Sequence, residues 1–73
     1  DSYIQVNPGV QIGGAVSVEE GVLIGSGSTI RQGLKIRKAS TIGSGSVVLS
    51  TVREGITVLG NPAKRLKISS FDE

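Results

Sequence analysis

Aliphatic residues return at every sixth position over most of this chain. The set in register is Val6, Ile12, Val18, Ile24, Ile30, Ile36, Ile42 and Val48. An α-helix brings apolar residues back about every 3.6 positions and a half-buried strand about every 2, so neither produces this spacing. A six-residue repeat therefore organises the chain.

Two other positions of the repeat also have a constant character. Three places after each aliphatic residue lies a small one: Gly9, Ala15, Gly21, Gly27, Gly33, Ala39 and Gly45. Glycine is used where φ is positive or where two backbones come close, so this position predicts a tight corner in every repeat. The next position is small or aliphatic and is expected to tuck under the bend: Val10, Val16, Val22, Ser28, Leu34, Ser40 and Ser46. The remaining positions are mostly polar and are expected to face solvent.

Short strands joined by regular corners cannot bury their apolar faces one by one, so they must coil and stack. The repeat therefore predicts an all-β fold, a parallel β-helix of about two and a half to three coils in which the eight aliphatic residues point inward. We expect residues 1–60 to form the β-helix and residues 61–73 to form a terminator loop and a short C-terminal tail.

The repeat is expected to fail after Val48, because its next aliphatic position falls on Glu54. Residues 53–55 are predicted as a loop before a closing strand over 56–59. Proline lacks the ladder donor and fixes φ, so the sheet is expected to end within 60–64, around Pro62. Beyond it, residues 65–68 are expected to form one helical turn or a short covering strand.

The chain has 73 residues, a size at which a hydrophobic core rarely suffices alone, so we expect an oligomer. It has no cysteine, which excludes disulfides and thiolate metal sites and fits a reducing compartment. No apolar run is long enough to span a membrane and no signal peptide is visible, so a cytoplasmic protein without membrane association is expected. Because it begins at Asp1 and lacks methionine, we expect it to be cut from a longer chain.

The net charge is only +2, and Tyr3 and Phe71 are the only aromatic residues, so nucleic-acid binding is not expected. Positive charge does concentrate in the outward positions between Ile30 and Ala39: Arg31, Lys35, Arg37 and Lys38. This cluster is interpreted either as a solubilising, edge-protecting surface or as a patch that meets phosphate groups.

Three other features depart from the repeat. Glu19 and Glu20 are interpreted as a solvated corner. Leu23 and Val47 occupy an outward position that is otherwise polar, which predicts a subunit interface. Gly14 is not required by the corner pattern. It either gives slack for a bend or lets a ligand approach the backbone.

The sequence resembles the hexapeptide acyltransferases, whose fold is a left-handed β-helix. The resemblance rests on the Ile-Gly-Xaa-Gly-Ser units at 24–28 and 42–46, on residues 6–14, and on the closing segment Val-Leu-Gly-Asn-Pro-Ala-Lys at 58–64. It extends from about residue 3 to 65 and is most similar to the C-terminal part of sugar O- and N-acetyltransferases that modify sialic acid or amino sugars of bacterial surface glycans. It implies three hexads per coil, so that residues eighteen apart stack about 4.8 Å from each other.

The resemblance also implies a site. In that family acyl-CoA lies in a groove between the β-helices of two neighbouring subunits of a trimer, and a sugar or nucleotide sugar accepts the acyl group. Gly14, Ser26 and Ser44 match positions that line the groove, with Gly25 and Gly43 keeping the corner open. Lys64 and Arg65 match a basic segment that approaches the phosphates of the cofactor, with plain solvation as the alternative.

The transfer needs a base with a near-neutral pKa, a task that suits histidine. This chain has no histidine. In the resembling family the catalytic histidine lies just before the point where this chain begins, and a second one falls at Gln5, which cannot take a proton at neutral pH. Glu19, Glu20 and Glu54 are expected on solvated corners with pKa values too low for the task. No catalytic residue and no metal ligand is therefore assigned.

Two hypotheses follow from these observations. The chain is either the acyl-CoA-binding β-helix of an acetyl-CoA-dependent sugar acetyltransferase, or a non-catalytic assembly or scaffold module. An ice-binding β-helix is disfavoured, because Thr29, Thr41 and Thr51 do not recur at eighteen-residue intervals on one face.

Overall fold

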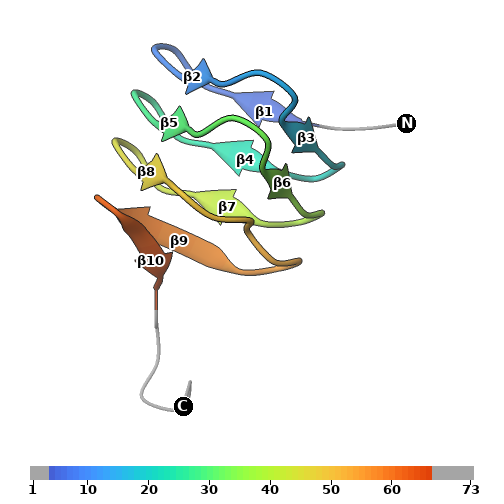
Figure 1. The fold of residues 1–73 in the computed structure, drawn as a ribbon. Coiled ribbons are helices and arrows are strands. Elements are labelled where there is room, and N and C mark those ends of the chain that lie inside the picture. Colours follow the sequence, from blue (N-terminus) through green and yellow to red (C-terminus); the bar gives the residue numbers. More distant parts are fainter. Residues whose placement is uncertain (1–3, 67–73) are drawn as a thin grey trace.

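The chain winds into a three-sided solenoid of very short parallel strands (Figure 1). It is seen in a computed structural model that describes residues 4–66. Sheet A contains β1 (Gln5–Val6), β4 (Leu23–Ile24), β7 (Thr41–Ile42), β9 (Thr57–Gly60) and β10 (Ala63–Arg65). Sheet B contains β2 (Gln11–Ile12), β5 (Thr29–Ile30) and β8 (Val47–Val48), and sheet C contains β3 (Ser17–Val18) and β6 (Lys35–Ile36).

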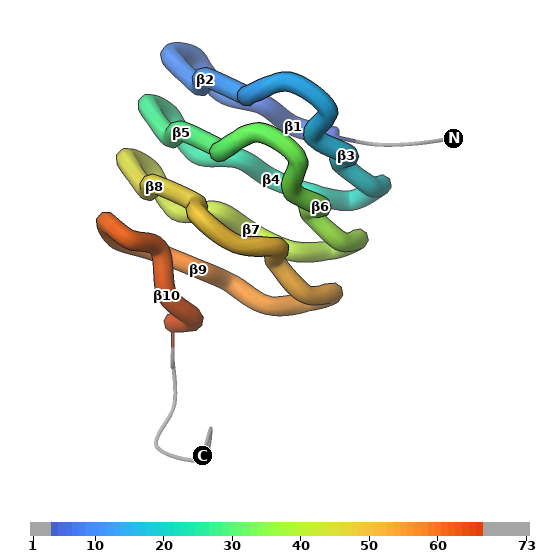
Figure 2. The backbone as a smooth tube through the Cα atoms, viewed as in Figure 1, coloured from blue at the N-terminus to red at the C-terminus, as the bar shows by residue number. Residues whose placement is uncertain are grey.

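Three edges separate the sheets, and each is a column of corners. Edge AB is made of residues 7–10, 25–28 and 43–46. Edge BC is made of residues 13–16, 31–34 and 49–51. Edge CA is made of residues 19–22, 37–40 and 53–56. Figure 2 shows how successive coils repeat the same path around these edges.

The coils stack in a register of eighteen residues. Val6 pairs with Ile24, and Ile24 pairs with Ile42, so these residues form one inward column, as expected for three hexads per coil. Backbone N–H groups of one coil donate to carbonyls of the next, as from Leu23 to Ser40 at 3.1 Å and from Gly25 to Ile42 at 2.8 Å. The predicted left-handed β-helix with three hexads per coil is confirmed.

The core is formed by inward-facing residues from all three sides of the second and third coils. Its most buried members expose no more than 2% of their surface, and they are Val22, Ile24, Ile30, Ile36, Ile42, Val48 and Val52. The prediction that all eight aliphatic residues are buried is wrong for three of them, since Val6 and Ile12 are 47% and 43% exposed and Val18 is only half-buried. They belong to the first coil, and in residues 4–66 no other coil lies above it to cover them.

The position under the bend is buried at Val22, Ser28, Ser40 and Ser46, as predicted, and is half-buried at Val10, Val16 and Leu34. Ser28, Ser40 and Ser46 are fully buried, and each hydroxyl donates to a backbone carbonyl. Ser40 donates to the Arg37 carbonyl at 2.6 Å, and Ser46 donates to the Gly43 carbonyl at 2.7 Å. Serine is therefore compatible with the core because a buried hydroxyl with a partner avoids the desolvation cost of an unpaired one.

The unbroken six-residue spacing ends after Val48, as expected, but the inward positions resume with a shift of two residues. Val52 bridges to Ile36 and Val58 pairs with Ile42, so each partner lies sixteen residues away instead of eighteen. In the third coil only residues 49–51 separate Val48 from Val52. In the second coil five residues separate the corresponding Ile30 and Ile36. Edge BC is thus shorter in the third coil, and Gly55 forms the next corner at a φ of 74°.

The closing segment is a hairpin, so the expected end of the sheet near Pro62 is also wrong. The strand runs over Thr57–Gly60 instead of 56–59, and β10 pairs with it antiparallel to add a last strand to sheet A. Pro62 lies in the turn between the two strands, where its missing N–H costs no ladder hydrogen bond. The β10 strand rules out a helical turn beginning at residue 65; the rest of the predicted tail, residues 67–73, lies outside the described residues.

Two corners carry alanine at the position where glycine is usual. Ala15 and Ala39 both have a φ of 60°, in the left-handed region that strains any residue with a Cβ atom. We expect Ala39→Gly to raise the free energy of unfolding by about 1 kcal/mol. The reverse change Gly45→Ala, at a φ of 71°, should lower it by a similar amount. Urea unfolding of the two variants measures both effects, and a loss of stability in Ala39→Gly would contradict the assignment of strain.

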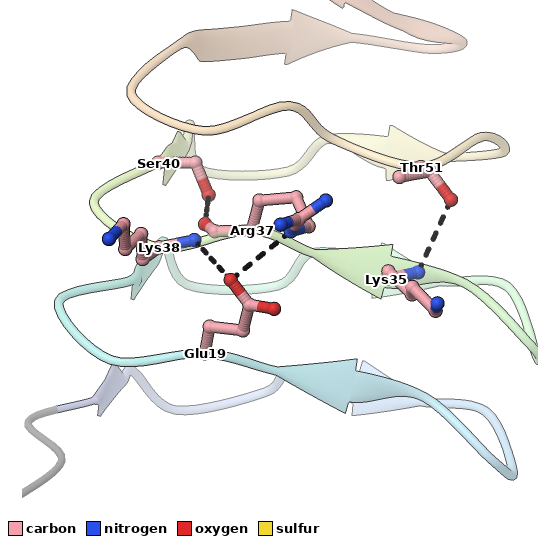
Figure 3. Close-up of polar contacts among 6 residues, drawn as sticks. All are labelled: Glu19, Lys35, Arg37, Lys38, Ser40 and Thr51. Atoms are coloured by element: carbon pink, nitrogen blue, oxygen red, sulfur yellow. Dashed lines mark hydrogen bonds and ion pairs between the residues drawn. The ribbon is translucent and has the colours of Figure 1, made fainter.

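An ion pair links the first two coils at edge CA (Figure 3). Arg37 Nε lies 3.2 Å from Glu19 Oε1, and the same oxygen accepts the Lys38 backbone N–H at 3.0 Å. The hydrogen bond from Arg37 is the main cause that lowers the pKa of Glu19 below its ordinary value of 4.5. Glu19 is therefore a paired residue, and the interpretation of this corner as merely solvated does not hold for it.

A lowered carboxyl pKa makes stability depend on acid. Glu19 favours the folded state above its ordinary pKa of 4.5, and this contribution is lost as the pH falls through the lower pKa of the folded protein. Glu19→Gln should therefore flatten the decline of stability on the acid side of pH 4.5. Arg37→Gln should flatten it too, because the main cause of the shift is removed. Urea midpoints measured across that range test this, and unchanged curves in both variants would contradict it.

Candidate functional site

Edge AB presents the serine column that the sequence predicts. Ser26 lies directly above Ser44, because the Gly45 N–H donates to the Ser26 carbonyl at 2.8 Å, and the Gly27 N–H donates to the Pro8 carbonyl above it at 3.1 Å. Both serines are exposed. The predicted stacking of Ser26 on Ser44 at one corner is confirmed, and it leaves a line of small side chains along the outside of the solenoid.

Gly25 and Gly43 have a different role from the one expected. A Cβ atom on Gly25 would lie 2.6 Å from the Ser44 nitrogen, and one on Gly43 would collide with the Leu59 side chain. The space that these glycines were expected to leave open is filled by the next coil. Their missing side chains let coils pack closely, so any contact with a cofactor would involve their backbone; this contact stays a prediction.

Gly14 has open space beside it. An added Cβ atom would have no neighbour within 4 Å, and its φ lies outside the left-handed region. Gly14 belongs to edge BC, however, whereas Ser26 and Ser44 belong to edge AB. One solenoid therefore does not bring the three residues together, and a single groove contacts them all only when edge BC of one copy faces edge AB of another.

Lys64 and Arg65 lie on opposite faces of the closing hairpin. Arg65 pairs with Val58, which is 6% exposed on the inner face, and Lys64 pairs with Leu59, which is 44% exposed on the outer face. Directly paired residues of antiparallel strands share a face and successive residues alternate. Arg65 thus faces the base of the solenoid, and Lys64 projects outward near edge AB.

A pocket of about 370 Å³ lies at this base. Its apolar lining comes from Ile56, Val58 and Ala63, and its polar and charged lining comes from Ser50, Thr51, Arg53, Lys64 and Arg65. Ser50, Thr51 and Arg53 are functional candidates that sequence reasoning missed. The signal was present, since Val52 and Val58 are six residues apart with Gly55 three places after Val52, but it is two residues out of phase.

The other surface predictions have mixed outcomes. Leu23 lies on sheet A and Val47 on sheet B, so the two do not form a patch on one sheet. Lys35 lies on sheet C, flanked by Arg31 on edge BC and by the paired Arg37 on edge CA. Both interpretations of this basic side, as a solubilising surface and as a patch that meets phosphate groups, stay predictions.

The described residues contain no evident base for acyl transfer. Histidine is absent from the sequence, and the hydrogen bond from Arg37 moves the Glu19 pKa further from neutrality. The Gln5 side chain donates to Asn7 Oδ1 at 3.5 Å. Within residues 4–66 there is no group of three or more His, Asp or Glu side chains placed to hold a metal ion. The same part of the chain forms no helix with the length and apolarity to cross a membrane.

Comparison with solved structures finds acetyltransferases. A serine acetyltransferase in complex with CoA is 38% identical, with a TM-score of 0.82, over 86% of this chain and 28% of its own. The acetyltransferase domain of PglB from Neisseria gonorrhoeae with acetyl coenzyme A is 36% identical, with a TM-score of 0.81, over 86% of this chain and 31% of its own. PerB from Caulobacter crescentus with CoA and GDP-perosamine is 29% identical, with a TM-score of 0.83, over 85% of this chain and 30% of its own.

The fold is thus that of the hexapeptide-repeat acetyltransferases, and the chain spans less than a third of the length of these relatives. No protein-family model and no curated protein matches the sequence. The subfamily that acts on sialic acid, which the sequence was expected to resemble most, is not distinguished by these neighbours. They include serine acetyltransferases as well as a protein crystallised with a nucleotide sugar.

The two kinds of glycine predict opposite responses to substitution. Gly14→Leu should change the free energy of unfolding by less than about 0.5 kcal/mol, because the added side chain enters open space. Gly25→Ala should lower it by about 1–3 kcal/mol, because the added Cβ atom overlaps the Ser44 backbone. Urea unfolding measures both, and similar losses in the two variants would contradict these roles.

Proposed function

We propose that this chain is the acyl-CoA-binding β-helix of an acetyl-CoA-dependent acetyltransferase that acetylates a sugar hydroxyl or amine. The observation that carries the proposal is the likeness to the acetyltransferases with bound CoA or acetyl-CoA, at 36–38% identity over 86% of this chain. The sugar acceptor is the finer part of the proposal. It is supported by the GDP-perosamine complex of PerB and by the resemblance of the closing segment to sugar acetyltransferases.

The residues present fit a long, thin thioester. Gly14 offers open space beside its backbone, and Ser26 and Ser44 offer a stacked line of small polar groups. Since these features occupy different edges, the proposed groove lies between edge BC of one copy and edge AB of the next. A closed ring of copies provides this arrangement at every interface, and a homotrimer is the assembly we propose.

The chemistry requires one proton transfer. The acceptor oxygen or nitrogen attacks the thioester carbonyl, a base removes its proton, and the CoA sulfur leaves and is protonated to the thiol. This chain supplies binding and orientation, which lower the entropic cost of bringing the reactants together. Because the chain contains no histidine, the proposal assigns the base to a group outside residues 1–73.

The second candidate function is a non-catalytic assembly module. The observation that favours it is Gln5, which stands where the resembling family has a cofactor-facing histidine and cannot take a proton at neutral pH. Binding of CoA separates the two candidates, because a scaffold has no need of the groove.

The expected cytoplasmic location stays a prediction.

Titration of CoA by calorimetry tests the groove. We expect binding to the unaltered protein and a loss of about tenfold or more in Gly14→Leu and in Ser44→Leu, whose larger side chains would enter the pantetheine path. The control is Glu20→Leu, which adds a leucine at the same hexad position on edge CA. No heat at millimolar CoA, or equal losses in the control, would reject the proposed groove.

Mixed oligomers test whether the groove lies between copies. Gly14→Leu leaves edge AB intact, and Ser44→Leu leaves edge BC intact. Unfolding and refolding the two variants together should therefore restore roughly a quarter of the sites, those in which both intact edges meet. Recovery is measured as CoA bound per chain, and a mixture that binds no better than either variant alone would contradict a shared groove.

A further inference from the structure

Gln32 occupies the same place on edge BC that Ser44 occupies on edge AB. The Gly33 N–H donates to the Gly14 carbonyl at 2.9 Å, so Gln32 lies directly below Gly14. On edge AB the equivalent hydrogen bond, of 2.8 Å, places Ser44 directly below Ser26. The two edges therefore share one backbone arrangement at this point and differ in the side chains that they present.

The glycine before each upper residue shows the same equivalence. A Cβ atom on Gly13 would lie 2.6 Å from the Gln32 nitrogen, and one on Gly25 would lie 2.6 Å from the Ser44 nitrogen. The fold thus requires Gly13 for the close approach of the next coil. It does not require Gly14, which has open space beside it. The Gln32 side chain begins in the coil directly below that open space.

Gln32 differs from its counterparts in length and chemistry. The stacked positions that match it on the two edges carry shorter side chains, and they are Pro8, Gly14, Ser26 and Ser44. Gln32 is exposed, and among residues 4–66 its amide has no hydrogen-bond partner. A carboxamide has a carbonyl acceptor and two N–H donors. These groups are therefore available to a ligand that lies along edge BC.

The chemistry of Gln32 matches one part of CoA. The pantetheine arm contains two secondary amides, and each presents an N–H donor beside a carbonyl acceptor. A neutral carboxamide has no charge to attract phosphate, but it can pair with both groups of such an amide. We propose that Gln32 binds an amide of the pantetheine arm by donating one hydrogen bond and accepting another, and so favours acyl donors that carry this arm.

This inference rests on the proposed function, in which edge BC of one copy faces edge AB of the next. The small side chains of Ser26 and Ser44 leave space between the two edges, and Gln32 extends into that space from edge BC. The open space beside Gly14 then receives the arm one coil higher. Gly14 and Gln32 thus have complementary roles, since one provides room and the other provides the polar contact.

Gln32→Met tests the contact, because methionine keeps the length of the side chain and lacks the amide. Calorimetric titration should show CoA and pantetheine each bound about three- to tenfold more weakly, as expected for the loss of hydrogen bonds to a neutral group. The urea unfolding midpoint should not change, because the Gln32 side chain is exposed and supports no other residue among those described.

The matched control is Lys38→Met. Lys38 lies in the same coil and at the same hexad position on edge CA, where the Ala39 N–H donates to the Glu20 carbonyl at 3.0 Å. Because pantetheine carries no charge, loss of the lysine should change its affinity by less than about twofold. Equal losses of pantetheine affinity in Lys38→Met and Gln32→Met would overturn the proposed contact.

The remaining outcomes separate this inference from the proposed function. If Gly14→Leu and Ser44→Leu weaken CoA binding and Gln32→Met does not, the groove stands and the role of Gln32 is overturned. If Gln32→Met weakens binding of CoA but not of pantetheine, Gln32 contacts the nucleotide, and the proposed amide contact is wrong. If the unaltered protein binds neither ligand, the groove and this inference fail together.

Discussion

The structure depends on the hydrogen bonds that each coil makes with the next. A strand of two residues buries too little to be stable alone, so every strand relies on neighbours one coil above and below. The bonds fix the register at eighteen residues and place like side chains over one another. The isoleucine column, the buried serines and the glycine corners all follow from that register. The first coil shows what happens without a second neighbour. Among the described residues it has a coil on one side only, and its inward Val6 and Ile12 are exposed.

The same register explains why glycine has three roles in this chain. At the corners its positive φ lets the chain turn, as at Gly45. After an inward isoleucine, as at Gly25, its missing side chain lets the next coil come within contact distance. At Gly14 neither demand applies, since the φ is ordinary and the space is open. A glycine that the fold does not require is the one whose presence a ligand would best explain, so Gly14 is the strongest candidate on edge BC.

The closing part of the chain shows how a small deletion reshapes a surface. Because the third coil is two residues short, Val52 and Val58 continue the inward columns from a shifted position. The hairpin of β9 and β10 then covers part of the base and carries Arg65 to the same pocket as Arg53. The chemistry of the base thus depends on a change of phase in the repeat as much as on the residues themselves.

The sequence by itself determined the coil, the inward columns and the corners, because a hexad constrains every residue to one environment repeated around a regular solenoid. The stacking of Ser26 on Ser44 was also predicted, but it needed the eighteen-residue coil that the resemblance to the hexapeptide acyltransferases implies. Only the tertiary structure decided that Gly14 and these serines lie on different edges, that the space beside Gly25 is filled, and that Lys64 and Arg65 face opposite ways. It also decided which residues line the base. These properties depend on contacts between coils and on a register shift, and a period counted along one chain does not contain that information.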